Sequence, residues 1–303
     1  MTKPRVGYVG LIGRPNVGKS TFLNRIIGQK VAIISDKPQT TRISILGIHN
    51  TERGQIIFMD NPGIHKPLHQ LNRRMMNFVY SSLETADLLC LMIDATMKFG
   101  HGDEFVLETL SKVSTPIILL INKVDAIKKE KVLLAIDHYK ELLPFKEIIP
   151  VSALKGINID VAEDQIFNHL PEADKLYEDD DITIQSDRFM IAEIIREKIL
   201  ARVRQELPFT TAVLVDKIED HTPEDAEEGS RRTTYIRASI IVEKSNHRKI
   251  ILGKQGENIR DIGKEARLEL VDLLESTIFL DLHVKVKTRW RDEDDILTKI
   301  ETQ

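Results

Sequence analysis

The nine residues from Gly13 to Thr21 constrain this chain more than any other stretch. In order, they contain a glycine, any four residues, a second glycine, a lysine and a serine, which is the pattern of a phosphate-binding loop. The apolar run at 6–12 predicts a buried strand before the loop, and residues 21–27 predict the first turns of a helix after it. The loop chemistry requires this context, because glycines let backbone N–H groups turn toward a phosphate and a helix N-terminus favours the same anion. A chance glycine-rich turn is the alternative, and the flanking strand and helix disfavour it.

Two side chains of this loop have specific predicted roles. Lys19 can reach the β- and γ-phosphate oxygens of a nucleotide, and the Ser20 hydroxyl can hold Mg²⁺. We predict nucleotide contacts along the whole loop, from Gly13, Arg14, Pro15, Asn16, Val17, Gly18, Lys19, Ser20 and Thr21.

The composition limits the kind of protein that carries this loop. A length of 303 residues suits two domains better than one, and no apolar run approaches the ~20 residues of a membrane-spanning helix. The formal net charge of -4 excludes a basic field over the whole molecule, so a nucleic-acid site must be a local patch. The single cysteine, Cys90, excludes an internal disulfide framework and a multi-cysteine zinc site. Because no signal peptide is recognisable, we expect the chain in the reducing cytoplasm.

The polar stretch at 29–47 predicts a mobile loop between the first helix and the next strand signals. A threonine in it can complete the shell of Mg²⁺ when a γ-phosphate is present. Thr40 and Thr41 both fit this role, and the sequence leaves the choice between them open.

An acidic residue follows at the end of the next predicted strand, at 55–60. A carboxylate beside a phosphate loop can orient Mg²⁺ directly or through water, which is the predicted role of Asp60. The next residues, Asn61, Pro62 and Gly63, extend the predicted nucleotide contacts, with the Gly63 N–H directed at the γ-phosphate. The alternative is that Asp60 simply starts the turn before Pro62. The predicted metal ligands are Ser20, Thr41 and Asp60.

His65 and His69 are spaced like metal ligands. However, Pro67 lies between them and no third ligand is near, so we predict histidines of a solvated loop.

The run at 115–121 predicts a buried strand that delivers Asn122, Lys123, Val124 and Asp125 at its C-terminal end. Asp125 can accept from both the ring N–H and the exocyclic amine of guanine, whereas adenine would leave the carboxylate unpaired. Asn122 can brace neighbouring loops, and the stem of Lys123 can cover the base. A last strand at 147–151 leads to three residues whose backbone can contact the guanine carbonyl: Ser152, Ala153 and Leu154.

Strand and helix signals alternate through the first half of the chain. Residues 86–94 predict another buried strand, and residues 102–112 have helical spacing. This alternation predicts an α/β fold with a doubly wound, mostly parallel sheet, in which a ligand binds at the carboxyl ends of the strands. Every motif described so far falls at such an end.

The second half has a different pattern. Residues 172–187 are largely acidic, lack apolar periodicity and predict an exposed linker. After them, a helix is predicted at 189–205, strands at 211–215 and 235–242, and a final strand at 279–286. Between the last two strands, helical patterns flank the four residues Gly253–Gly256, so this half is expected to be an α+β domain.

The tetrapeptide Gly253-Lys254-Gln255-Gly256 has the form of the loop with which KH modules clamp single-stranded RNA. Seven Lys/Arg and three acids lie between 244 and 267, a local excess of four positive charges in an acidic chain. A helix–turn–helix cap with a solvated basic face is the alternative. We predict an RNA site formed by Arg248, Lys249, Gly253, Lys254, Gln255, Gly256 and Arg260.

Five ordered motifs resemble those of a translation-factor-class GTPase. They are Gly13–Ser20, Thr40–Arg42, Asp60–Gly63, Asn122–Asp125 and Ser152–Leu154. Followed by one KH-like half, they resemble the Era family of GTPases over nearly the whole chain. The resemblance implies a P-loop GTPase domain at 1–171, an acidic linker at 172–187 and a type II KH domain at 188–303.

The chain departs from this branch of GTPases at Asn61, where the branch usually has threonine. Ile64 stands where signalling GTPases have a water-orienting glutamine, and this branch often has a hydrophobic residue there, so catalysis must come from elsewhere. In relatives with asparagine at the place of Asn16, that side chain helps to bind K⁺. The resemblance therefore implies that Lys19, Thr41, Gly63 and Asn16 carry catalysis.

The resemblance also implies ligands and partners. They are GTP or GDP, Mg²⁺, K⁺, and RNA near the 3′ end of small-subunit ribosomal RNA during assembly of the small ribosomal subunit. A monomer in the cytoplasm is expected, with loose association with the inner face of the cell membrane. An RNA-tethering protein whose nucleotide site is structural is the competing hypothesis, and the direction of coupling between nucleotide and RNA stays open.

Overall fold

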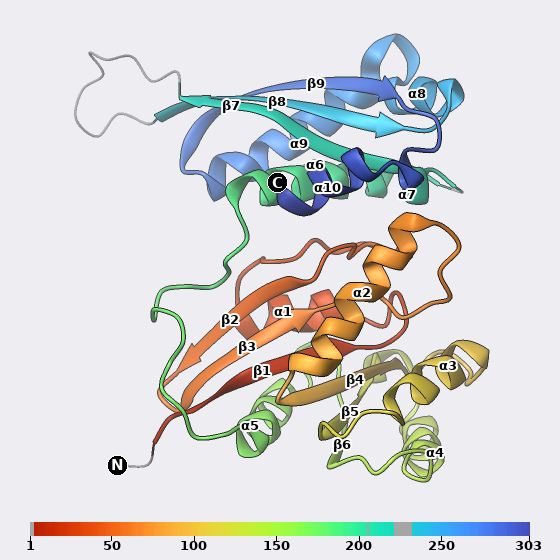
Figure 1. The fold of residues 1–303 in the computed structure, drawn as a ribbon, viewed down its shortest axis with the longest axis vertical. Coiled ribbons are helices and arrows are strands. Elements are labelled where there is room, and N and C mark those ends of the chain that lie inside the picture. The colour runs from red at the N-terminus through yellow and green to blue at the C-terminus, as the bar shows by residue number, and fades with distance from the viewer. Residues whose placement is uncertain (1–2, 205, 221–231) are drawn as a thin grey trace. The chain divides into compact units, whose positions relative to one another are not determined.

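The computed structural model describes residues 3–204, 206–220 and 232–303, and the chain divides into two compact units (Figure 1). The first contains the residues up to Leu68 together with Asn72–Ile184. The second contains His69–Leu71 and Gln185–Gln303. Among the described residues, no helix is both long enough and apolar enough to cross a bilayer.

The first unit contains a six-stranded sheet with the strand order β2-β3-β1-β4-β5-β6. All neighbouring strands pair in parallel except β2 and β3, which are antiparallel. The mostly parallel, doubly wound sheet is therefore confirmed. The strands are β1 (Arg5–Ile12), β2 (Ile45–Thr51), β3 (Gly54–Asp60), β4 (Leu88–Asp94), β5 (Ile117–Asn122) and β6 (Glu147–Pro150).

Helices cover both faces of this sheet (Figure 1). On one face lie α2 (Gln70–Thr85), α3 (His101–Leu110) and α4 (Lys129–Tyr139), and on the other lie α1 (Lys19–Ile27) and α5 (Ile159–His169). The first face is closed by buried apolar side chains such as Val79 of α2 and Val106 of α3, which pack on Leu89 and Leu119. Because both faces are covered, β1, β4 and β5 are near-continuous apolar runs, the pattern that made them visible in the sequence.

The predicted loop at 29–47 is shorter than expected. Residues 45–47 belong to β2, which the sequence analysis missed, and the strand lies at the edge of the sheet. Its sequence, ILGIHNT, is less apolar than those of β4 and β5 and contains a glycine, so it gives a weaker strand signal.

The acidic stretch after α5 is not a free linker. Residues 172–183, here called the strap, run along the first unit from the start of β1 to β2. Isolated bridges join Glu172 to Arg5 and Thr183 to Gly47, and the Ile48 N–H donates to the Ile182 carbonyl. The strap therefore extends the first unit to Ile184, beyond the predicted boundary at 171.

Two amide side chains hold the middle of the strap. Gln55 is fully buried; its Nε2 donates to the Tyr177 carbonyl at 2.9 Å, and its Oε1 accepts from the backbone N–H groups of Leu176 and Tyr177. Asn50 Nδ2 lies 3.1–3.2 Å from three strap carbonyls, those of Glu178, Asp179 and Asp181. Because side chains rather than a regular ladder hold this segment, no periodicity of its own predicts its position.

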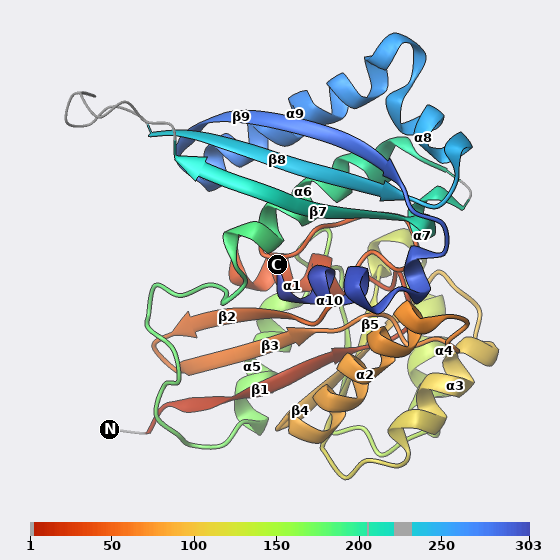
Figure 2. The same cartoon turned by 45° about the horizontal axis from the view of Figure 1, so that its top comes forward.

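The second unit contains a three-stranded sheet with the order β7-β8-β9, in which β8 pairs antiparallel with β7 and parallel with β9. Helices α6 and α9 cover one face of it (Figures 1 and 2), and their apolar residues, such as Ile195 and Ile262, pack with Ile240 of β8. The predicted type II KH order is confirmed. The elements are α6 (Asp187–Arg202), α7 (Leu207–Thr210), β7 (Thr211–Asp220), β8 (Arg232–Val242), α8 (Ser245–Leu252), α9 (Glu257–Leu273), β9 (Ser276–Val286) and α10 (Asp294–Thr302).

Candidate functional site

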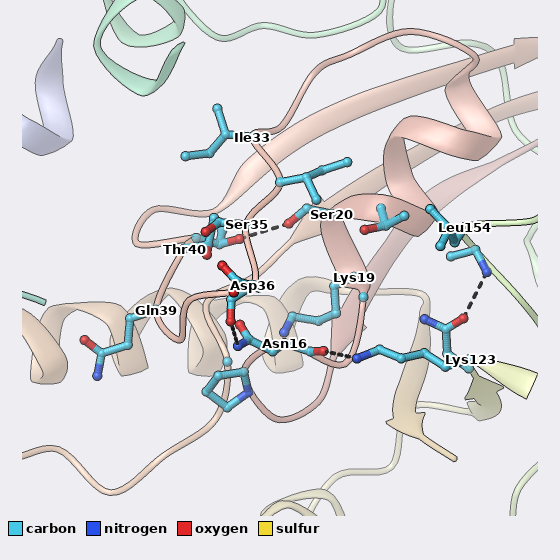
Figure 3. A pocket seen from close by; sticks show the side chains of 18 of the residues that line it. Asn16, Lys19, Ser20, Ile33, Ser35, Asp36, Gln39, Thr40, Lys123 and Leu154 are labelled. Carbon is cyan, nitrogen blue, oxygen red and sulfur yellow. Dashed lines mark hydrogen bonds between the residues drawn. The ribbon is translucent and has the colours of Figure 1, made fainter. Parts of the chain in front are cut away.

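The carboxyl ends of the strands in the first unit surround a cavity of about 560 Å³ (Figure 3). Its walls come from the loop after β1, the loop before β2, the residue Gly63 after β3, and the segments after β5 and β6. The predicted motifs therefore meet at one edge of the sheet. The cavity is lined by Pro15, Asn16, Gly18, Lys19, Ser20, Thr21, Ile33, Ile34, Ser35, Asp36, Gln39, Thr40, Thr41, Gly63, Asn122, Lys123, Asp125, Ala126, Ala153 and Leu154.

The loop between β1 and α1 depends on Gly18, the second glycine of the phosphate-loop pattern. Gly18 has φ 103°, and a Cβ at this position would lie 2.3 Å from Asn122 Nδ2. Any larger residue would be strained and would displace the loop from β5. Helix α1 then begins at Lys19, so its N-terminus is directed at the cavity and presents backbone N–H groups to an anion.

Lys19 lies in the cavity between Asn16 and Ser20 (Figure 3). Only 6% of its surface is exposed, and its ammonium group donates to the Arg14 carbonyl at 3.2 Å and approaches that of Gly13 at 3.5 Å. Burial lowers the pKa of Lys19 to about 8, against the attraction of Asp60. The loop carbonyls hold the ammonium group where phosphate oxygens can replace them as its partners.

The three predicted metal ligands converge. The Ser20 hydroxyl donates to Asp60 Oδ2 at 2.6 Å, the Thr41 hydroxyl donates to the same oxygen at 3.3 Å, and the two hydroxyl oxygens lie 3.1 Å apart. Burial raises the pKa of Asp60, although Lys19 and both hydroxyls favour its charged form. Among the described residues Asp60 Oδ1 has no hydrogen-bond partner although it is buried. Two hydroxyls and a carboxylate with a free oxygen fit a hard, oxygen-seeking cation such as Mg²⁺.

The geometry distinguishes between the two candidate threonines. Thr41 is 8% exposed and faces Ser20 and Asp60. The Thr40 hydroxyl instead donates to the Lys37 carbonyl at 2.6 Å, within its own loop. Of the two threonines, Thr41 is therefore the one that faces the other predicted metal ligands.

Gly63 lies directly against the phosphate loop. A Cβ on Gly63 would be 2.4 Å from the Pro15 nitrogen, and the next N–H, that of Ile64, donates to the Gly13 carbonyl at 3.0 Å. The Ile64 side chain is 2% exposed and packs in the core against α2 and β4. It therefore cannot reach a water molecule in the cavity.

Asn122 joins three loops on the side of the cavity where Asp125 lies. Its Nδ2 donates to the Val17 carbonyl at 2.8 Å, and its Oδ1 accepts from the Ala153 N–H at 2.9 Å. The Ser152 hydroxyl donates to Asp125 Oδ1 at 2.6 Å and orients that carboxylate. The predicted bracing role of Asn122 fits these contacts. Ser152 lies outside the cavity lining and contacts Asp125, which lines it.

Lys123 and Asn16 connect the phosphate loop to its neighbours (Figure 3). The Lys123 ammonium group donates to the Asn16 carbonyl at 2.9 Å and to Asp94 at 2.6 Å. Burial acts to raise the pKa of Asp94, but hydrogen bonds from Lys123 and Thr96 outweigh it and hold the pKa below its ordinary value. The Asn16 side chain donates to the Asp36 carbonyl at 2.6 Å, which ties the loop before β2 to the phosphate loop.

Two predicted contact residues direct their side chains elsewhere. Arg14 pairs with Asp103 of α3 at 2.8 Å, outside the cavity. Asn61 is fully buried; it donates to the Met59 carbonyl and accepts from the Ser82 hydroxyl at 2.8 Å. Their side chains therefore fix neighbouring elements. Seven predicted contact residues lie outside the cavity lining: Gly13, Arg14, Val17, Asp60, Asn61, Pro62 and Ser152.

Sequence reasoning missed the cavity wall formed by the loop before β2, namely Ile33, Ile34, Ser35, Asp36 and Gln39. It also missed Arg25 of α1, whose guanidinium donates to the carbonyls of Ala153 and Leu154. A positive residue in the last turn of α1 is a weak signal, because such residues also stabilise the helix dipole.

The prediction that His65 belongs to a solvated loop is wrong. His65 is half-buried, and its ring nitrogens lie 2.7 Å from the Gly63 carbonyl and 2.6 Å from Asn72 Nδ2. Within the described parts of the chain, no group of three His, Cys, Asp or Glu side chains could hold a metal ion.

The second unit has a groove of about 600 Å³ between α9 and the edge strand β9. The Gly253–Gly256 loop connects α8 to α9, with Gly253, Gln255 and Gly256 at positive φ. Gly256 and Arg260 line the groove, Lys254 and Gln255 are exposed in the loop, and Arg248 and Lys249 are exposed on α8.

Further cationic and aromatic side chains line the same groove. Lys264 and Arg267 continue the face of α9 that begins with Arg260, and Phe279 of β9 is 59% exposed. Cations suit phosphates, and an exposed aromatic ring suits a stacked base. Of these three cations only Arg260 was predicted as a site residue. The spacing of Arg260, Lys264 and Arg267 at four and three residues is the sequence signal that would have placed Lys264 and Arg267 on the same face.

Two family models match the chain. One, described as a 50S ribosome-binding GTPase, matches residues 8–123, and a KH domain model matches residues 218–291. A GTPase Era of Halothermothrix orenii is 42% identical over 97% of both chains. A GTPase Era of Leuconostoc citreum is 45% identical over 96% of this chain and 94% of its own.

Two solved structures are similar over 98% of both chains at 40% identity. One is Era in complex with MgGDPNP and nucleotides 1506–1542 of 16S ribosomal RNA, with a TM-score of 0.92. The other is a variant of Aquifex aeolicus Era bound to GDP and AlF4-, with a TM-score of 0.91.

Proposed function

Because this chain belongs to the Era family of GTPases, we propose that it is a switch in the assembly of the small ribosomal subunit. It binds GTP with Mg²⁺, hydrolyses it to GDP and phosphate, and binds single-stranded RNA near the 3′ end of small-subunit ribosomal RNA. The observation that carries this proposal is the convergence of Ser20, Thr41 and Asp60 beside Lys19. The similarity to Era bound to MgGDPNP and 16S ribosomal RNA over nearly the full chain supports both halves.

Each group at the cavity has a proposed task. Ser20, Thr41 and Asp60 hold Mg²⁺, which would neutralise charge on the β- and γ-phosphates. Lys19 leaves its two loop carbonyls and binds phosphate oxygens, while the Gly63 N–H and the first turn of α1 donate to the same group. Asn16 is proposed to help bind K⁺ through its side-chain oxygen, because its Nδ2 already donates to the Asp36 carbonyl.

Specificity for guanine is proposed to come from Asp125. Ser152 occupies one oxygen of the carboxylate, and this bond fixes the plane in which the carboxylate accepts from the base. Asn122 keeps Ala153 and the phosphate loop at a fixed separation, so that base and phosphates are recognised together.

The RNA site is proposed to be the groove beside α9. The Gly253–Gly256 loop lets the backbone approach phosphates. Positive charge comes from Arg260, Lys264 and Arg267, and Phe279 offers a face for a base.

We place the protein in the cytoplasm as a monomer with loose membrane association, supported by family membership. Sedimentation with anionic vesicles tests the last point, and an absence of binding would remove it.

The competing function is RNA tethering with a structural nucleotide site, and the burial of Ile64 favours it. Turnover of GTP, measured with and without single-stranded RNA and K⁺, separates the two. We expect multiple turnovers that increase with K⁺. Stoichiometric GTP binding without release of phosphate under all conditions would contradict the switch and favour tethering.

A further inference from the structure

We propose that His65 is a positioning residue for GTP hydrolysis, which connects the Gly63 turn to the loop that carries Thr41. This inference rests on the proposed function, because it assigns a further residue to the same reaction. His65 lies outside the cavity lining and acts through Gly63 and Gln39 rather than on the nucleotide.

Three segments of the first unit meet at the His65 ring. Its Nδ1 is 2.7 Å from the Gly63 carbonyl, two residues earlier in the chain. Its Nε2 is 2.6 Å from Asn72 Nδ2 at the start of α2 and 3.4 Å from Gln39 Nε2 in the loop before β2. Asn72 is 1% exposed, so this partner belongs to the packed interior and provides a fixed reference point.

The chemistry of these partners determines which ring nitrogen of His65 carries the proton. A carbonyl oxygen can only accept, so Nδ1 must carry the proton and donate to Gly63. Nε2 then has a lone pair, which accepts from the amide of Asn72 and faces the amide of Gln39. One N–H and one lone pair are therefore both required, a combination that an apolar side chain of similar size lacks.

The bonds act next to both groups that are proposed to complete the γ-phosphate site, the Gly63 N–H and the Thr41 hydroxyl. Holding the Gly63 carbonyl fixes the plane of the peptide that follows Gly63, and the N–H of that peptide, from Ile64, donates to the Gly13 carbonyl of the phosphate loop. Gln39 is at φ 60° and lies two residues before Thr41, so its position limits where the Thr41 hydroxyl can lie. His65 therefore connects the peptide that follows Gly63, the proposed phosphate donor, to the loop that carries Thr41, the proposed magnesium ligand.

The test compares kcat, KM and GDP affinity in full-length variants. His65→Leu fills the space without hydrogen bonds, and His65→Gln retains one N–H donor and one acceptor. His101→Ala is the matched control, because His101 is a fully exposed histidine paired only with Glu104 on α3 among the contacts of the described residues. We expect His65→Leu to lower kcat about tenfold, because misplacement of reacting groups has effects of this size. His65→Gln should recover most of this loss, while GDP affinity stays within about twofold in every variant.

Two results would overturn the role of His65. One is a kcat for His65→Leu equal to that of the parent or of His65→Gln. The other is an equal loss of kcat and GDP affinity, which would indicate a purely structural residue. A parent protein that binds GTP but releases no phosphate would overturn the proposed hydrolysis itself, and this is measured before any variant is compared.

Discussion

At the scale of single residues, Lys19 combines burial with a place in the lining of the cavity. Burial removes its ammonium group from water and lowers its pKa to about 8. Phosphate oxygens favour the charged form, so the pKa must be higher in the complex than in the free protein. The contribution of Lys19 to affinity is then complete at pH values below the free pKa and is lost as the pH rises above it.

We therefore expect GTP affinity to be constant below pH 8 and to fall above it, by up to about tenfold per pH unit. Calorimetry between pH 7 and pH 9 measures this, and binding above about pH 8 should be accompanied by proton uptake. The Lys19→Ala variant should lose tight triphosphate binding at every pH. Affinity that is independent of pH in the parent, or retained in Lys19→Ala, would contradict the role of Lys19.

Asp125 carries a second prediction at this scale. In Asp125→Asn, the amide can donate to the extra carbonyl of xanthine, whereas one of its two acceptor positions for guanine is lost. We expect GTP affinity to fall at least about tenfold and the preference to shift to XTP. Competition between the two nucleotides for the variant measures the shift, and a variant that still prefers GTP would remove the base-reading role from Asp125.

The side-chain types of this site were predictable, but their directions were not. The loop pattern identifies Lys19 and Ser20 because phosphate chemistry requires those types at that spacing. Nothing in a sequence distinguishes Thr40 from Thr41, since the difference arises from one bond between Thr40 and the Lys37 carbonyl. Likewise Asn61 looks like a site residue until the buried hydroxyl of Ser82 is seen to hold it inward.

At the scale of elements, the Gly253–Gly256 loop carries a prediction for RNA binding. Lys254 and Gln255 are exposed, so replacing both with aspartate should change charge with little effect on folding. We expect single-stranded RNA affinity to fall at least about tenfold, or about 1.4 kcal/mol. GTP affinity should be unchanged, because the nucleotide cavity belongs to the first unit. Fluorescence anisotropy with RNA and calorimetry with GTP check both parts, and parental RNA affinity would place the RNA site elsewhere.

The elements differ in how far the sequence determines them. Strands β1, β4 and β5 were predictable because burial on both faces makes them apolar runs. Helices α2, α4 and α5 were missed. Of these, α4 has only two buried side chains, Val132 and Tyr139, so its apolar stripe is narrow.

At the scale of the whole molecule, the strap determines where the first unit ends. A chain that ends at Ile184 keeps the contacts to Gln55 and Asn50, whereas one that ends at 171 loses them. Truncation at 171 removes the three hydrogen bonds of Gln55 to Leu176 and Tyr177 and leaves its amide bonded only to Asn50 Oδ1 among the described contacts. The loss of these bonds corresponds to a cost of roughly 2–4 kcal/mol. Urea unfolding of the two truncated proteins measures the difference. Equal urea midpoints for the two truncated proteins would show that the strap adds no stability and would return the boundary of the first unit to residue 171.

The strap also has a consequence for the order of events during synthesis. A chain leaves the ribosome N-terminus first, so β2 is available long before the residues that cover its outer edge. The bonds that cover it come from Ile182 and Thr183, and α6 of the second unit begins four residues later, at Asp187. At ~5–20 residues per second, the strap takes on the order of one second to emerge. The nascent protein therefore has an open strand edge until the moment at which its second half begins to appear, and closing that edge is the last folding event of its first half.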